Sequence, residues 1–360
     1  MKKKKSIIFV FTISVLFLLC ACTKVNQSTD KTDGITTPTS TPTPTTTPTE
    51  TPTPTPTPEP KLAVNRENFP DSGFRDYILD HFDKDYDDAL SLDEIQDITE
   101  ITLPQKGIES IEGIQFFPFL EVLDCHGNNI TKINLKENKK LRQISCQNNP
   151  ELTELLYSTS PAVVSFIDCS NTLLTSLETC PSIRELNCNN SRLKALRFES
   201  GSSLEILNCV QTSYLTLGTI DIVECKNLRI LNASLAGHKL IIENEKLSRM
   251  QLNLYGNIKE LDLSKCTNLS WLVLTFYCPS ESQGGQTLTA TNLKNLFLAS
   301  VSFDMTRTNV SKNEYATADF SGCKSLESLS CYGVRTLKIS GCKKIDDLSY
   351  DEKITKVIRQ

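Results

Sequence analysis

The acidic side chains of residues 83–94 are the group in this chain whose types and spacing could bind a cation. The stretch reads "DKDYDDALSLDE", although the whole chain has a net charge of only −5. Its six acidic residues are Asp83, Asp85, Asp87, Asp88, Asp93 and Glu94. Carboxylates this close together repel one another unless a cation lies between them. The stretch is therefore either a metal-binding loop or a solvated acidic loop.

The spacing of the oxygen donors resembles the twelve-residue loop of an EF-hand. Positions 1, 3, 5, 7, 9 and 12 of that loop are occupied by Asp83, Asp85, Asp87, Ala89, Ser91 and Glu94. The resemblance implies Ca²⁺ bound by carboxylates, the Ala89 carbonyl, a water on Ser91 and both oxygens of Glu94. The sixth position, normally Gly, is Asp88, which adopts a positive φ at some cost. We expect a calcium site of weakened affinity, and the solvated loop remains the alternative.

The residues before the loop predict an entering helix. In "NFPDSGFRDYILDHF", Phe74, Tyr77, Ile78 and Phe82 recur on one helical face. The chain has one such loop, although sensing EF-hands usually occur in pairs. We therefore expect residues 62–97 to form a small helical cap in which calcium is structural.

Most of the remaining chain is an internal repeat with a period near 21 residues. The frame L-x-x-L-x-C occurs as "LEVLDC" (120–125), "LRQISC" (141–146), "IRELNC" (183–188) and "LEILNC" (204–209). It continues with other residues in the last position, as in "LSWLVL" (269–274) and "LKNLFL" (293–298), and ends as "IDDLSY" (345–350). Units of this size bury their apolar faces only by stacking on their neighbours.

The repeat resembles the leucine-rich-repeat family, and its second apolar motif, as in "IKELDLSKC", resembles the bacterial subtype called IRREKO. The resemblance covers residues 98–360 and implies a solenoid of parallel β-strands with about 11 units. A helical EF-hand-like piece before the repeats is similar to the arrangement in internalin-like surface proteins, where it caps the first repeat.

The cysteines follow the repeat rather than a disulfide or zinc pattern. One column occupies the last position of the frame, and a second column follows the other apolar motif: Cys180, Cys225, Cys266, Cys323 and Cys342. A free thiol in such a position acts as a small buried hydrophobe. We expect free thiols; some disulfides or a metal site are the alternatives. Cys278 fits neither column and is the candidate for reactivity.

The first 60 residues predict export and anchoring. A basic "MKKKK" and an apolar run end in Leu19-Cys20-Ala21-Cys22, which resembles a bacterial lipobox. The resemblance implies cleavage of residues 1–21 and a lipid on Cys22, and an ordinary secretory signal is the alternative. The Thr/Pro tract in residues 22–61 predicts a disordered, extended stalk. We expect the protein on the extracellular face of the bacterial membrane.

Catalysis and nucleic-acid binding have little support in the sequence. The three histidines are His81, His126 and His238, and no Gly-x-Ser-x-Gly or His-Glu-x-x-His motif occurs. The chain has 38 basic and 43 acidic residues, which is unlike a basic nucleic-acid surface.

A binding role through the strand residues that point outwards is the expected function. Exposed aromatic residues often anchor interfaces, and the candidate partner-binding residues are Ile230, Trp271, Val273, Phe276 and Phe297. We expect a monomer that binds a protein or glycan on a concave β-face; the "WLVLTFY" run packing on a nearby insertion is the alternative for these residues. A structural envelope protein that holds the cell wall or another surface protein is the alternative function.

Overall fold

The computed structural model describes residues 60–359 except 104, 161–162, 211–218, 237–238, 256–257, 278–285, 305–315 and 354. These residues belong to one compact unit, Pro58–Gln360. The predicted signal segment, Cys22, nearly all of the stalk and Cys278 lie outside the described residues. Among those described, no helix has the length and apolar character needed to cross a membrane.

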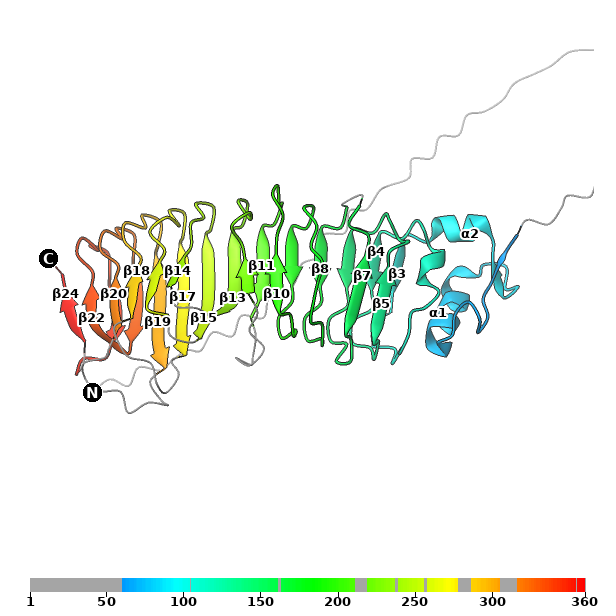
Figure 1. Cartoon of the computed structure of the whole chain (residues 1–360), viewed down its shortest axis with the longest axis horizontal. Helices are drawn as coiled ribbons and strands as arrows, with labels where there is room; N and C mark the ends of the chain where they lie inside the picture. Colours follow the sequence, from blue (N-terminus) through cyan, green and yellow to red (C-terminus); the bar gives the residue numbers. More distant parts are fainter. Residues whose placement is uncertain are drawn as a thin grey trace, which may run out of the picture. The chain divides into compact units, whose positions relative to one another are not determined.

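The described residues form two α-helices, a 3-10 helix and many short strands (Figure 1). The helices are α1 (Ser72–Phe82), α2 (Leu92–Asp97) and η1 (Ile114–Phe116). The first twelve strands are β1 (Leu62–Ala63), β2 (Ala89–Leu90), β3 (Glu100–Thr102), β4 (Val122–Asp124), β5 (Lys132–Leu135), β6 (Gln143–Ser145), β7 (Glu154–Tyr157), β8 (Phe166–Asp168), β9 (Glu185–Asn187), β10 (Ala195–Arg197), β11 (Ile206–Cys209) and β12 (Thr219–Asp221). The others are β13 (Ile230–Ala236), β14 (Lys239–Ile241), β15 (Arg249–Tyr255), β16 (Glu260–Asp262), β17 (Trp271–Tyr277), β18 (Thr287–Thr289), β19 (Leu298–Asp304), β20 (Ala316–Asp319), β21 (Ser328–Tyr332), β22 (Val334–Lys338), β23 (Asp347–Tyr350) and β24 (Lys356–Ile358).

The strands stack into a parallel β-solenoid, which confirms the predicted fold class. A 12-stranded sheet, here called the long sheet, runs in the order β23-β21-β19-β17-β15-β13-β11-β9-β8-β6-β4-β3. A 6-stranded sheet of even-numbered strands, β14 to β24, and the pairs β5-β7 and β10-β12 are formed by the second apolar motif of each turn. Every pairing in these sheets is parallel, so the chain rises by one strand spacing per turn (Figure 1).

Alternation of side chains across the long sheet explains the repeat frame. Ile144, Ile167, Leu186 and Leu207 stand in register on neighbouring strands and are fully buried. Since successive side chains of a strand point to opposite faces, the residues between them point outwards. One face of the long sheet is therefore the solenoid core, and the other, here called the outer face, carries the variable residues.

One copy of the frame is shifted from its predicted position. Trp271 pairs with Leu298, so the turn aligned with "LSWLVL" is "LFLASV" (296–301) and not "LKNLFL". Leu296, Ala299 and Val301 are buried there, whereas Leu298 is partly exposed. The prediction was wrong because Leu293 and Leu296 have the same spacing as Leu296 and Ala299, and only the stacking of neighbouring turns distinguishes the two frames.

The segment that contains α1 and α2 precedes the solenoid and is joined to its first turn by aromatic side chains. Asp71 caps α1 by accepting a hydrogen bond from the Phe74 amide at 2.9 Å, and Phe74 is buried. The ring of the fully buried Phe69 lies 5.8 Å from that of Phe74 and 6.0 Å from that of Phe117, which follows η1. Phe69 thus connects α1 to the start of the solenoid.

Candidate functional site

The acidic loop between α1 and α2 brings three of its predicted ligands together. Asp83, Asp85 and Asp87 each offer a carboxylate oxygen, and these atoms lie within 4.8 Å of one another. The Asp83 side chain is only 5% exposed and accepts hydrogen bonds from the amides of Asp87 and Asp88 at 3.3 and 3.0 Å. Asp88 has φ = 61°, the positive value expected at the sixth loop position, and Tyr86 has φ = 58°.

The ammonium of Lys61 lies against this cluster. Its Nζ is 2.7 Å from Asp85 Oδ2 and 2.5 Å from Asp87 Oδ2. The hydrogen bonds with Asp85 and Asp87 raise the pKa of Lys61, and the hydrogen bond from Lys61 lowers the pKa of Asp85. Lys61 directly precedes β1, so one positive charge from the end of the Thr/Pro tract is held on the loop. The sequence analysis did not identify this residue, which lies 22 positions before Asp83.

The rest of the loop is held by backbone pairing and by a helix cap. Ala89 and Leu90 in β2 pair antiparallel with Ala63 and Leu62 in β1. This short pairing gives the single loop a strand partner.

The last predicted ligand, Glu94, lies apart from the three aspartates and forms a capping box with Ser91. Its Oε2 accepts from the Ser91 amide and hydroxyl, both at 2.8 Å, and its Oε1 accepts from the Lys84 amide at 2.7 Å. Burial alone would raise the pKa of Glu94, but these hydrogen bonds lower it below its ordinary value. The sequence signal that identified Glu94 as a ligand is equally the signal of a helix N-terminus.

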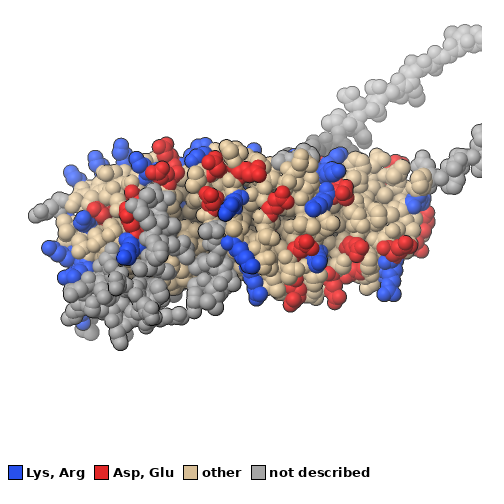
Figure 2. Space-filling view, in the orientation of Figure 1, with Lys and Arg blue, Asp and Glu red and all other residues tan. Residues whose placement is uncertain are grey.

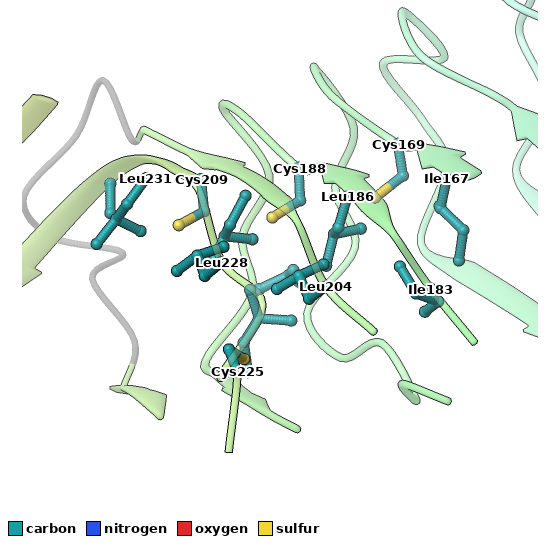
Figure 3. Close-up of a cluster of buried hydrophobic side chains, with 14 of the residues drawn as sticks. Ile167, Cys169, Ile183, Leu186, Cys188, Leu204, Cys209, Cys225, Leu228 and Leu231 are labelled. Carbon is teal, nitrogen blue, oxygen red and sulfur yellow. The ribbon is translucent and has the colours of Figure 1, made fainter. Parts of the chain in front are cut away.

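The cysteines form two files of buried thiols, as expected from the repeat. In the part of the chain that the structure describes, eleven cysteines are free, and all but the half-buried Cys342 are buried. Figure 3 shows Cys169, Cys188 and Cys209 on consecutive turns, each pointing into the core beside leucine and isoleucine side chains. Burial raises the pKa of the Cys125, Cys146 and Cys169 thiols, and it raises the pKa of Cys225 and Cys266 to about 11. The files are part of the core and offer no thiolate for chemistry near neutral pH.

After each of these frame cysteines, a side chain donates a hydrogen bond to the cysteine carbonyl. The donor is an amide in the early turns and a hydroxyl in later ones. Asn149 Nδ2 donates to the carbonyls of Cys125 and Cys146, both at 3.0 Å. Thr172 and Ser191 replace the asparagine in later turns, and each hydroxyl donates to the carbonyl of the preceding cysteine at 2.8 Å. The loss of the asparagine is therefore compatible with the fold, because the buried carbonyl keeps a donor.

The outer face of the long sheet is polar and charged in its first half. Asp124 Oδ1 lies 2.7 Å from His126 Nδ1, and Asp168 Oδ2 accepts from Asn187 at 2.9 Å. Over the molecular face in Figure 2, acidic and basic side chains are interspersed among uncharged ones.

The second half of the outer face carries aromatic side chains, only some of which were predicted. Trp271 and Val273 are half-buried on this face, and the guanidinium of Arg249 lies 5.7 Å from the centre of the Trp271 ring. Tyr255 and Tyr277 stack at 4.6 Å with an interplanar angle of 10°. Taking every second residue from Trp271 would have found Tyr277, and the same rule applied to β15 would have found Tyr255.

Two of the five predicted partner-binding residues lie elsewhere. Phe276 is only 3% exposed and stacks on Phe303 in the core, with ring centres 4.2 Å apart. Phe276 lies on the same buried side of β17 as Leu272 and Leu274, so the prediction that it faces a partner was wrong. Phe297 is 45% exposed but precedes β19, in line with Ser270 and beside the edge of the face. Ile230, the remaining candidate, is half-buried on the outer face of β13.

Comparisons with known proteins identify solenoids of the same class. No family model matches the chain, and no curated protein sequence matches it. Among solved structures, an internalin, InlF, from Listeria monocytogenes is 17% identical over 81% of this chain and 98% of its own, with a TM-score of 0.41. The functional domain of InlJ from Listeria monocytogenes, described as including a cysteine ladder, is 17% identical over 78% and 77%, with a TM-score of 0.33. The leucine-rich-repeat protein LIC12759 from Leptospira interrogans is 13% identical over 72% and 81%, with a TM-score of 0.31. Similarity at this level carries no conclusion about function.

Proposed function

We propose that this chain is a cell-surface leucine-rich-repeat protein that binds a protein or glycan partner on the outer face of its long sheet, without catalysis. The observation that carries the proposal is the aromatic second half of that face, where Trp271 and the stacked Tyr255–Tyr277 pair are displayed on adjacent strands. Aromatic side chains anchor interfaces because they bury much area with few rotatable bonds.

The amino-terminal segment supports a location outside the cell. In this proposal Cys22 carries the lipid that anchors the chain to the extracellular face of the membrane. The Thr/Pro tract then acts as a semi-rigid spacer, because proline-rich sequence favours extended polyproline II. A binding face on such a spacer would be held away from the membrane surface.

The first test measures binding to an array of proteins, glycans and purified cell wall. We expect selective binding by the full chain, weakened at least about tenfold by Trp271→Ala, because interface aromatics contribute on the order of 2 kcal/mol. Tyr86→Ala is the matched control, since Tyr86 is 85% exposed on the cap. Retention on cell wall alone, unchanged by Trp271→Ala, would contradict the proposal and favour the envelope scaffold.

We also propose that the acidic loop binds a structural Ca²⁺. The donors suit the ion, because calcium prefers several carboxylate oxygens and Asp83, Asp85 and Asp87 supply three within 4.8 Å. The Ala89 carbonyl, Ser91 through a water, and Glu94 would complete the shell, with Glu94 turning from its capping position. The bound ion would supply positive charge that offsets the repulsion among the carboxylates. Without a bound ion, the Lys61 ammonium supplies part of that positive charge through its contacts with Asp85 and Asp87.

Calcium should raise the melting temperature of the protein, and Lys61 should oppose it. We expect an apparent affinity in the range of extracellular modules, about 10⁻⁴–10⁻³ M, and a stabilisation of about 2.7 kcal/mol at a hundredfold excess over the dissociation constant. Asp85→Asn should abolish the shift. Lys61→Ala should increase calcium affinity severalfold, because the ion no longer competes with a tethered ammonium.

Thermal unfolding with calcium, with magnesium and with EDTA measures these effects. Asp97→Asn is the matched control, since Asp97 pairs with Lys84 outside the cluster. If neither the unmodified chain nor Lys61→Ala responds to calcium, the loop is a solvated acidic loop closed by Lys61.

A further inference from the structure

Four neighbouring strands of the long sheet, β15, β17, β19 and β21, place their outward residues in four rows. The register defines the rows, because Arg249 pairs with Trp271, Trp271 with Leu298 and Leu298 with Ser328. The second row is Gln251, Val273, Ser300 and Ser330, and the third is Asn253, Thr275, Ser302 and Tyr332. The fourth row contains Tyr255 and Tyr277. Here the four rows together are called the aromatic face.

Aromatic rings flank uncharged polar side chains on this face. Trp271 stands in the first row and the stacked tyrosines in the fourth, while Tyr332, 44% exposed, stands in the third. Each row is two residues from the next along the strand, so the first and fourth rows are roughly 20 Å apart. Only an extended ligand could contact both Trp271 and Tyr277.

The chemistry between the rings is that of neutral donors and acceptors. The second and third rows contain amides and hydroxyls, and each of these groups both donates and accepts hydrogen bonds. Neighbours within a row are about 4.8 Å apart. Among the described side chains of the four rows, Arg249 is the only charged one. The first half of the outer face differs, because it contains Asp124, His126, Asp168 and Glu185.

These features favour a saccharide over a protein as the partner of the aromatic face. Sugar hydroxyls have the same dual hydrogen-bonding capacity as the amides and hydroxyls of the second and third rows, and these two rows contain no charged side chain. One side of a pyranose ring presents C–H groups, which pack on the electron-rich face of an indole or phenol. Aromatic walls with a few orienting polar groups are the usual composition of a small-ligand site.

We infer that the aromatic face binds an uncharged, extended oligosaccharide, with Trp271 and Tyr277 stacking on sugar rings and Gln251, Asn253 and Ser300 hydrogen-bonding their hydroxyls. This inference rests on the proposed function and names the ligand class of the same face. Because the contacts are neutral, binding should be nearly independent of ionic strength.

Trp271 is the single tryptophan of the chain, so its fluorescence reports directly on the face. The experiment titrates the full chain with neutral hexasaccharides of galactose, glucose, mannose and xylose, and with the hexamer of galacturonic acid as a charged match to galactose. We expect a saturable change in Trp271 emission with at least one neutral hexasaccharide. We also expect the galacturonic acid hexamer to bind at least about tenfold more weakly than the responsive neutral hexasaccharide, and the affinity for the neutral ligand to change little between low and high salt.

Variants assign the binding to the proposed contacts by calorimetry. Trp271→Ala and Tyr277→Ala should each weaken binding of the responsive hexasaccharide by about tenfold or more. Trp271→Phe and Tyr277→Phe, which keep an aromatic ring, should lose severalfold less. Tyr86→Ala, on the cap, should bind like the unmodified chain.

The inference is overturned if no neutral hexasaccharide binds, if the galacturonate hexamer binds as well, or if Trp271→Ala and Tyr277→Ala leave binding unchanged. Failure of the inference is distinguishable from failure of the proposed function. A protein captured on the array and lost with Trp271→Ala would sustain the binding role while excluding the saccharide. If neither a saccharide nor a protein binds, both the inference and the proposed function are refuted.

Discussion

The solenoid should unfold cooperatively as the pH rises from about 9 to 10, below the pKa of about 11 at which Cys225 and Cys266 ionise in place. Eight buried cysteines have a raised pKa. Burial disfavours the thiolate of Cys125, Cys146, Cys169, Cys225, Cys266, Cys323 and Cys331, and a hydrogen bond with Cys209 together with burial raises the pKa of Cys188. In the unfolded chain the same thiols ionise near their ordinary pKa of about 8.5. Above that pH the unfolded state therefore binds fewer protons than the folded state, and the free energy of unfolding falls.

The magnitude follows from the number of thiols. Each contributes a fall of about 1.4 kcal/mol per pH unit between its unfolded and folded pKa, and eight together contribute roughly 11 kcal/mol per unit. Each thiol stops lowering the free energy of unfolding at its folded pKa. This pKa is about 11 for Cys225 and Cys266 and about 12 for Cys323 and Cys331. A folded domain is usually stable by about 5–15 kcal/mol, so a rise of about 0.5–1.5 pH units above the unfolded pKa should exhaust that margin.

Denaturant unfolding followed by circular dichroism, under reducing conditions from pH 7 to 11, measures this dependence. Replacing Cys225 and Cys266 by alanine separates the thiols from tyrosine and lysine, which also titrate in this range. The double variant should lose stability with pH less steeply, by about 2.7 kcal/mol per unit for two thiols. A slope equal to that of the unmodified chain would show that the thiols do not drive alkaline unfolding.

Replacing Gly113 by alanine should detach the cap from the first turn and lower the free energy of unfolding by about 3–5 kcal/mol. Gly113 has φ = 108°, a value that residues with a Cβ rarely adopt. A Cβ there would overlap the ring of Phe69 and lie 2.6 Å from the carbonyl oxygen of Asn68. Since Phe69 is fully buried against Phe74 and Phe117, its ring cannot move without opening the junction between α1 and the solenoid.

Gly201→Ala provides a matched control for the backbone strain alone. Gly201 also has a positive φ, +85°, but nothing lies within 4 Å of the position of its Cβ. That variant should lose only about 1 kcal/mol. Limited proteolysis and thermal unfolding measure both variants, and equal losses would show that the contact with Phe69 is unimportant.

The sequence by itself determined the solenoid, because the physics that defines it is local and repeated. A frame of leucines and cysteines every 21 residues or so must bury the same positions in each turn, and Cys125, Cys146, Cys169 and Cys188 are buried as that frame predicts. The same holds for α1, where the spacing of Phe74, Tyr77, Ile78 and Phe82 predicts a helix without reference to the rest of the chain.

The tertiary structure decided which of several compatible patterns the chain uses. "LKNLFL" and "LFLASV" both satisfy the leucine spacing, and only pairing with β17 selects the second. Phe276 and Trp271 both lie in one aromatic run, but they point to opposite sides of β17. Phe276 is therefore in the core and Trp271 is on the outer face. These choices depend on neighbouring turns that no local stretch contains.

The acidic loop shows most clearly which features the sequence determined and which features the tertiary structure decided. The resemblance of Asp83, Asp85 and Asp87 to positions 1, 3 and 5 of an EF-hand loop implied that their carboxylates converge, and these oxygens lie within 4.8 Å of one another. That Lys61 lies against Asp85 and Asp87 depends on β1 pairing with β2. That pairing joins residues 26 and 28 positions apart in sequence, so the cation that the chain itself supplies to the loop is a product of the tertiary fold.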